Sequence, residues 1–203
     1  MLTHGPLAAD TLHLCIDMQR VFAEDTPWHT SWMPRVLPVV VRLVEASPER
    51  TVFTRFMPVR RPEDAHGAWR RYYNRWAELT LDRAGSALFD IVPELASFCP
   101  PAQIFDKSTY APWGAAAFDR AMAERHPSTL IITGTETDVC VLATILGAVD
   151  RGYRVIVPTD AICSSSDATH DALLALYHHR YAEQIETATS EEILAGWPST
   201  PRD

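Results

Sequence analysis

The sequence is almost without lysine. Lys and Arg together account for 18 of its 203 residues, and Lys107 is the only lysine among them. Arginine can replace lysine on a solvated surface. It cannot replace a compact ammonium whose pKa shifts on burial, because the guanidinium is larger, planar and always charged. Lys107 is therefore a candidate functional residue, although a single lysine can also remain by chance.

Long hydrophobic runs are absent as well. The most apolar stretch, from Met33 to Val44, is interrupted by Arg35, Pro38 and Arg42, whereas a helix that crosses a bilayer needs about 18 uninterrupted apolar residues. The sequence therefore predicts no membrane span. The N-terminal segment has no basic residue before its first apolar stretch and no small-residue cleavage pattern. It does not resemble a secretory signal, so we expect a cytoplasmic protein.

Cysteine and positive charge are also scarce. The four cysteines form no CxxC pair and no dense pattern, which is typical of a reducing compartment and leaves a thiol free for chemistry. A net charge of −8 opposes binding to a nucleic-acid backbone. We expect a small molecule as the partner, with no nucleic acid and no membrane. Of the four thiols, three are interpreted as structural: Cys15, Cys99 and Cys163.

Length and composition indicate one domain with a single core over residues 1–203, because 47% of the residues are hydrophobic and 22% are charged. Short apolar runs predict strands. These runs are Leu12–Ile16, Thr51–Thr54, Gln103–Phe105, Thr129–Thr133, Arg154–Val157 and Glu183–Glu186.

Longer amphipathic segments alternate with these runs and predict helices. They are Met33–Ala46, Ala87–Phe98, Gly114–His126, Asp138–Arg151, Asp167–Tyr181 and Ser190–Trp197. A strand followed by a helix, repeated about six times, predicts an α/β fold: a three-layer α/β/α sandwich around a mainly parallel, Rossmann-like sheet of about six strands. In such sheets the ligand binds beyond the carboxyl ends of the strands.

The segment 56–85 breaks this alternation. It is rich in Arg, Trp, Tyr and Pro, and it is too long for an ordinary connection between a strand and a helix. We expect an elaborated loop with a short helix near Ala68–Trp76. It either caps the pocket or forms a subunit interface; its composition favours an interface, and with it a homo-oligomer, a dimer or tetramer. The last residues, 198–203, are expected to fray.

Three chemically distinctive residues follow three predicted strands. Asp17, Lys107 and Cys140 each lie just beyond a strand end, where the ends converge on one crevice. Each also has an ordinary explanation: a helix cap for Asp17, a solvated loop residue for Lys107 and an inert small hydrophobe for Cys140. Their coincidence favours a nucleophile with an acid–base partner and a cation.

The residues before Cys140 favour a reactive thiol. Thr137 or Asp138 can cap the helix that follows, which puts Cys140 in its first turn. Unpaired N–H groups and the helix dipole stabilise a thiolate there, and a nearby Lys107 would lower the pKa of the thiol further. The same N–H groups could hold a developing oxyanion.

Three segments carry a family resemblance. DMQRVF (17–22), FDKSTYAPW (105–113) and GTETDVCV (134–141) resemble, in order and spacing, the signature segments of the isochorismatase-like cysteine hydrolases. The similarity extends over nearly the entire chain. It implies the non-metal branch of that family, related to nicotinamidase and N-carbamoylsarcosine amidase, and the fold described above.

The resemblance also implies the site. The matching catalytic triad is Asp17, Lys107 and Cys140, and a non-proline cis peptide bond is expected between Thr135 and Glu136. The backbone N–H groups of Glu136 and Cys140 would then form the oxyanion hole. Residues expected to contact the substrate are Phe22, by resemblance, and Arg55, Tyr110, Trp113 and Val139. The candidates for the pocket wall are Arg55, Tyr110, Trp113 and Glu136. Arg55 would suit a carboxylate on the substrate.

Nicotinamidases of this group carry a D-x-H metal motif after the second strand. That place reads TRFMPVRRPEDAH here, and His66 alone is insufficient for a site that needs three or more ligands. We therefore predict no metal and no cofactor.

The implied reaction is C–N hydrolysis of a small amide, carbamoyl or ureido compound through a thioester. Two alternatives stay open: vinyl ether hydrolysis of the isochorismatase type, and a non-catalytic binding or redox-sensing module that uses Cys140.

Overall fold

A single sheet forms the centre of the molecule. The computed structural model describes residues 2–197, so the expected fraying of 198–203 lies outside the described part. Every strand pair in the sheet is parallel, in the order β3-β2-β1-β4-β5-β7, with β6 paired to the end of β4. The strands are β1 (Leu12–Ile16), β2 (Thr51–Phe56), β3 (Gln103–Lys107), β4 (Thr129–Thr135), β5 (Arg154–Pro158), β6 (Ile162–Cys163) and β7 (Ile185–Ala188).

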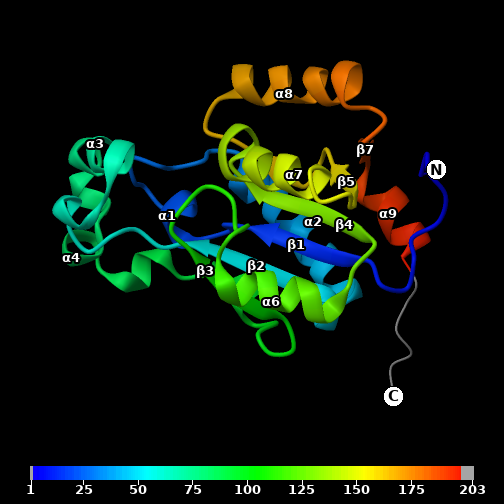
Figure 1. Ribbon diagram of the computed structural model, residues 1–203, viewed down its shortest axis with the longest axis horizontal. Coiled ribbons are helices and arrows are strands. Elements are labelled where there is room, and N and C mark those ends of the chain that lie inside the picture. The colour runs from blue at the N-terminus through cyan, green and yellow to red at the C-terminus, as the bar shows by residue number, and fades with distance from the viewer. Residues whose placement is uncertain (1, 198–203) are drawn as a thin grey trace.

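Helices cover both faces of this sheet (Figure 1). The α-helices of residues 2–197 are α1 (Arg20–Ala23), α2 (Met33–Ala46), α3 (Gly67–Arg75), α4 (Leu81–Ala84), α5 (Pro93–Ala96), α6 (Ala116–Arg125), α7 (Leu142–Val149), α8 (Asp167–Arg180) and α9 (Ser190–Gly196). The predicted α/β/α sandwich with a parallel sheet is confirmed. None of the helices in the described part of the chain has the length and apolar character needed to cross a bilayer.

Alternate residues of each strand supply two core layers, because successive side chains of a strand point to opposite faces. On one face, Cys15 of β1 and Phe53 of β2 pack with residues of α2 and α9. On the other, Leu14 and Ile16 of β1 pack with residues of α6 and α7. Burial on both faces explains why the strands read as continuous apolar runs rather than as alternating ones.

Several predicted elements differ from the structure, and one observed strand was not predicted. The expected helix Ala87–Phe98 is broken into a 3₁₀ turn at Ser86–Phe89 and the short α5, because Ile91 instead forms a bridge with Gln19. The last strand lies at Ile185–Ala188, two residues later than predicted. The two-residue strand β6 was not predicted, because it is too short to show a periodic pattern.

The segment 56–85 extends the molecule at one end. Figure 1 shows α3 and α4 standing beyond the carboxyl ends of β1 and β4, on the side opposite the N-terminus. The short helix expected near Ala68–Trp76 is α3, at Gly67–Arg75. Side chains of α3 pack onto residues that follow the strands, and this segment therefore forms part of the surroundings of the sheet's carboxyl edge.

Gly134 lets the two central strands approach each other. It pairs with Ile16 across β1 and β4, and its φ of 112° lies in a region that favours glycine. A Cβ atom at this position would lie 2.0 Å from the carbonyl oxygen of Ile16. The carboxyl ends of β1 and β4, which precede Asp17 and Cys140, can therefore lie this close only with glycine at position 134.

We predict that Gly134→Ala destabilises the fold more than Gly152→Ala does. Both glycines have positive φ, but a Cβ at Gly152 would have no atom within 4 Å, so the control carries the backbone strain without the clash. The excess loss in the free energy of unfolding should be roughly 2 kcal/mol or more, measured by urea denaturation. Equal losses of stability in the two variants would contradict the close approach of β1 and β4 at Gly134.

His13 is a buried polar residue in the central strand. It is fully buried, and its ring nitrogens bond to the hydroxyls of Thr51 at 3.3 Å and Thr133 at 2.8 Å. Burial disfavours the charged ring and lowers the pKa of His13 to about 3. The folded protein therefore holds this imidazole neutral.

This burial predicts a pH dependence of stability. Between the unfolded-state pKa of about 6.5 and the folded-state pKa of about 3, the unfolded chain binds one more proton at His13 than the folded chain. The free energy of unfolding should fall as pH drops through this window, by up to about 1.4 kcal/mol per pH unit, and this part should be absent in His13→Gln. Urea denaturation at several pH values measures it. The exposed-site control His179→Gln should show the same dependence of the free energy of unfolding on pH as the wild type. If His13→Gln also showed the wild-type dependence, this would contradict the claim that buried, neutral His13 causes it.

Candidate active site

Asp17 occupies the turn that ends β1. Its backbone has a φ of 50°, a left-handed conformation that Asp and Asn adopt more readily than most residues. The backbone N–H of Asp17 donates to the carbonyl oxygen and to Oγ1 of Thr54, each at 3.2 Å. The Thr54 hydroxyl in turn donates to Oδ1 of Asp17 at 2.6 Å. Thr54 of β2 therefore orients the carboxylate, and its other oxygen remains for a second partner.

That partner is Lys107, the last residue of β3. Its Nζ lies 2.6 Å from Oδ2 of Asp17 and 3.1 Å from the carbonyl oxygen of Thr109. The two side chains are almost inaccessible, with 1% of Lys107 and 0% of Asp17 exposed. Burial is the largest single influence and would lower the pKa of Lys107, but Asp17 and Cys140 together outweigh it and leave that pKa above its ordinary value. The lone lysine of the sequence is therefore a buried cation that is paired with the carboxylate of Asp17.

Cys140 completes the group. Its thiol lies near enough to Asp17 and Lys107 for both to shift its pKa, so the structure brings residues from three strand ends together. The pKa of the thiol differs from the expectation. Burial raises it well above its ordinary value, Asp17 raises it further, and Lys107 opposes the shift without reversing it. The resting sulfur is a neutral thiol beside a carboxylate that can accept its proton.

The turn that holds Cys140 also differs from the prediction. Thr137–Val141 forms a π-helical turn before α7, and Glu136, without a side-chain cap, is its N-cap residue. The expected capping residues have other partners. Thr137 Oγ1 pairs with Nδ1 of His170 at 2.9 Å, and the Asp138 carboxylate accepts a hydrogen bond from the Ser164 hydroxyl. These contacts fix the turn to the segment that follows β6.

The peptide bond between Thr135 and Glu136 is cis, at the position that the family resemblance implies. Val139 is half-buried in the turn and packs against the core layer of α6 and α7. The oxyanion-hole role of the Glu136 and Cys140 N–H groups remains a prediction.

Gln19 is a site residue that sequence reasoning missed. It is fully buried, and its side-chain amide donates to the carbonyl oxygens of Phe56, at 3.2 Å, and Phe89, at 2.6 Å, while Oε1 accepts from the Phe56 N–H at 2.8 Å. Gln19 therefore joins the chain after β1 to the end of β2. The signal available in the sequence was that Gln19 is a polar residue of a buried segment and lies only two residues after Asp17.

A group of aromatic side chains reaches the triad through Phe56. We call Phe22, Trp28, Phe56, Trp69, Tyr72 and Tyr110 the aromatic cluster, since their rings contact one another in a continuous chain at centroid distances of 4.8 to 6.1 Å. Nζ of Lys107 lies 5.2 Å from the centroid of Phe56. Trp69 and Tyr72 come from α3, so the segment 56–85 contributes directly to the walls around the triad.

Two tyrosines of the cluster lie near the thiol. Burial raises the pKa of Tyr110, and its interaction with Cys140 raises it further. The pKa of Tyr72 is raised by burial first and then by Tyr110 and other neighbours that include Cys140. Phe22 stacks on Trp28 with ring centroids 6.0 Å apart. The structure therefore places Phe22 and Tyr110, two of the expected substrate contacts, in the aromatic cluster.

Arg55 and Trp113 do not lie at the pocket wall as expected. Arg55 follows Thr54 in β2, so its side chain points to the opposite face, where it pairs with Asp106 at 2.7 Å and Asp90 at 2.8 Å. Its guanidinium is occupied by carboxylates of the protein itself. Trp113 packs against α7 with its indole N–H donating to the carbonyl oxygen of Thr144 at 2.9 Å.

The metal-ligating residue types do not cluster. Within residues 2–197, no group of three or more His, Cys, Asp or Glu side chains could hold a metal ion. His66 precedes α3 as its N-cap residue and is exposed.

A comparison with protein families identifies the family of the chain. Residues 11–189 match the model of the isochorismatase domain, and the chain therefore belongs to the isochorismatase family. Among curated proteins, it is 31% identical over 112 residues to the secreted isochorismatase effector Isc1 of Phytophthora sojae, an alignment that covers 52% of this chain and 51% of that protein. The chain thus spans about half the length of this relative, and a similar share, 47%, of the Bacillus subtilis isochorismatase family protein PncA.

Solved structures share the fold. A cysteine hydrolase from Pseudomonas syringae superposes with a TM-score of 0.79 at 22% identity, covering 96% of each chain. The N-carbamoylsarcosine amidase from Thermoplasma acidophilum superposes with a TM-score of 0.72 at 18% identity, covering 90% of this chain and 98% of that one. At such identities the likeness establishes the architecture alone.

The triad predicts opposite effects of its two charged members on the thiol. Asp17→Asn should lower the pKa of Cys140, because it removes a negative charge beside the sulfur, and Lys107→Met should raise it, because it removes the cation. The pH dependence of iodoacetamide alkylation at Cys140, followed by peptide mass spectrometry, measures both. The exposed-site control Asp25→Asn should leave the profile unchanged. Shifts of the same sign in the two triad variants would contradict the arrangement.

Proposed function

We propose that the protein is a hydrolase that cleaves a C–N bond of a small amide, carbamoyl or ureido compound through a thioester on Cys140. The observation that carries this proposal is the meeting of a thiol, a carboxylate and an ammonium in one buried group. A neutral thiol beside a carboxylate can transfer its proton at the moment of attack.

The first half of the reaction forms the acyl-enzyme. Asp17 accepts the thiol proton while Sγ of Cys140 bonds to the substrate carbonyl carbon, and Lys107 stabilises the negative charge that moves from carboxylate to sulfur. The resulting oxyanion would be held by the N–H groups of Glu136 and Cys140. The C–N bond then breaks, and Asp17 returns the proton to the departing nitrogen. The products of this half are ammonia or an amine and a thioester.

Water completes the cycle. Asp17 accepts a proton from a water molecule that attacks the thioester carbonyl, the C–S bond breaks, and the proton passes to the sulfur of Cys140. A carboxylic acid leaves and the neutral thiol is restored. Since Asp17 is fixed by Thr54 on one oxygen and by Lys107 on the other, the same carboxylate can serve both halves without changing its position.

The surroundings of the triad favour a compact substrate with a flat or apolar acyl group. The walls near the thiol come from the aromatic cluster, and ring faces pack well against planar groups. A carboxylate-bearing substrate has less support than the sequence suggested, because Arg55 is paired with Asp90 and Asp106.

The redox-sensing alternative has less support than hydrolysis. A sensor cysteine needs thiolate character and solvent access. Cys140 has a raised pKa and is 5% exposed. Both properties suit a nucleophile that is activated only when a substrate is in place.

Ammonia release from a panel of primary amides, N-carbamoyl compounds and ureido compounds tests the proposal. For any compound of the panel that the wild-type protein hydrolyses, Cys140→Ala should reduce kcat/KM by at least about a thousand-fold. Lys107→Arg should reduce it by about a hundred-fold or more, because a guanidinium does not fit the place of a buried ammonium. Cys99→Ala, a half-buried cysteine outside the site, is the matched control and should keep wild-type activity. Full activity in Cys140→Ala would refute the proposal.

A further inference from the structure

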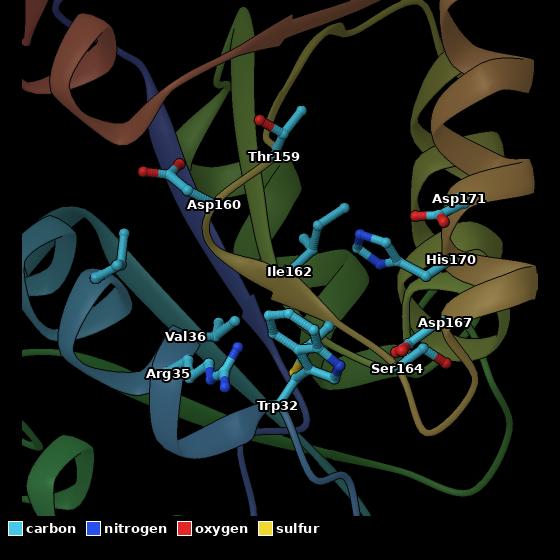
Figure 2. A pocket seen from close by; sticks show the side chains of 12 residues that line it. Trp32, Arg35, Val36, Thr159, Asp160, Ile162, Ser164, Asp167, His170 and Asp171 are labelled. Carbon is cyan, nitrogen blue, oxygen red and sulfur yellow. The ribbon is translucent and has the colours of Figure 1, made fainter.

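A cavity lies apart from the triad. It has a volume of about 440 Å³, within the range of small-molecule sites. Three parts of the chain enclose it: Trp32 with the first turns of α2, the segment 159–164 that includes β6, and the first turns of α8 (Figure 2). None of the triad residues lines it.

The floor of this cavity is apolar and the rim carries an exposed aromatic ring. Val36, Ile162 and Cys163 line it and are buried. Trp32 is 41% exposed, which is unusual for the largest apolar side chain. The guanidinium carbon of Arg35 lies 4.5 Å from the centroid of the Trp32 ring. A flat apolar group could therefore pack between this indole and the floor.

Charges of opposite sign face each other across the cavity. Figure 2 shows Asp167, His170 and Asp171 reaching from α8 toward Ile162, with Arg35 on the side of α2. In residues 2–197, neither Arg35 nor the two aspartates form an ion pair. Asp160, by contrast, is occupied by the N–H and hydroxyl of Ser190 at 2.8 and 2.6 Å.

We infer that this cavity is a second binding site, for a small zwitterion with a flat apolar group, such as an aromatic α-amino acid. Arg35 would take the carboxylate and Asp167 with Asp171 the ammonium, as charge-assisted hydrogen bonds. The apolar group would lie against Trp32 and Ile162. A phosphorylated ligand fits poorly, because the carboxylates of the wall outnumber Arg35.

The walls of this site are joined to the turn that holds Cys140. His170 of the cavity bonds to Thr137, and the Ser164 hydroxyl of the cavity donates to Asp138. The hydroxyl of Thr135 donates to the carbonyl oxygen of Cys163 at 3.3 Å. A ligand that moves α8 or β6 would move these partners of the turn as well. Occupancy of the site should therefore change the affinity of the triad for its substrate, and bound substrate should change the affinity of the second site for its ligand by the same factor.

Calorimetric titration of the wild-type protein with three probes tests the site without using enzymatic activity. The probes are L-phenylalanine, phenethylamine, which lacks the carboxylate, and 3-phenylpropionate, which lacks the amine. L-Phenylalanine should bind saturably, and each singly charged probe should bind about ten-fold more weakly or worse.

Charge-removing variants then assign each group. Arg35→Gln should weaken the binding of L-phenylalanine and of 3-phenylpropionate about ten-fold and leave the affinity for phenethylamine unchanged. The double variant Asp167→Asn with Asp171→Asn should weaken the binding of L-phenylalanine and of phenethylamine but not that of 3-phenylpropionate. Arg42→Gln, an exposed arginine of the same helix α2 that does not line the cavity, is the matched control and should bind all three as the wild type does.

Three results would overturn the site. They are equal affinity for the three probes, no saturable binding at millimolar concentrations, and a solution dimer that Trp32→Ala dissociates, since a second copy would then cover this face. Because each result is a binding or assembly measurement, it is independent of whether the triad hydrolyses amides.

Discussion

The buried pair of Lys107 and Asp17 is the constraint on which the site depends. Two charges removed from water are costly unless they meet at short range with their remaining hydrogen-bonding capacity filled. Here the lysine has Asp17 and the Thr109 carbonyl, and the aspartate has Thr54 and Cys140. Apart from Thr109, which follows Lys107 in the chain, these partners come from different strands or strand ends, so only the assembled parallel sheet brings them to the pair. The same geometry leaves the thiol neutral and adjacent to a base.

The turn after β4 connects this chemistry to the rest of the molecule. Gly134 allows β4 to lie against β1, and the π-helical turn then carries Cys140 to the carboxylate. Thr137 and Asp138 are bound by His170 and Ser164 instead of capping a helix. The turn is thus tied to the β6–α8 segment.

Much of the fold and the triad could be predicted from the sequence, because both depend on local patterns. Apolar runs gave the strands, and the order of strands and helices gave the edge at which Asp17, Lys107 and Cys140 meet. The shift in the pKa of Cys140 was predicted in the wrong direction. Burial raises this pKa more than Lys107 lowers it, and no local sequence pattern shows how far the site is shielded from solvent. Arg55 and Trp113 were misplaced because their partners, Asp90 and Thr144, become neighbours only through tertiary packing. Gln19 was missed for the same reason.

The most direct test of the account is the mass of the protein trapped during turnover. The protein is mixed with an excess of an amide that it hydrolyses, and the reaction is stopped with acid. Mass spectrometry of the intact protein and of its peptides should then find the acyl group of the substrate, without its nitrogen, on Cys140. Steady turnover with no adduct on Cys140, or with the acyl group on another residue, would contradict the claim that the buried triad works through a thioester.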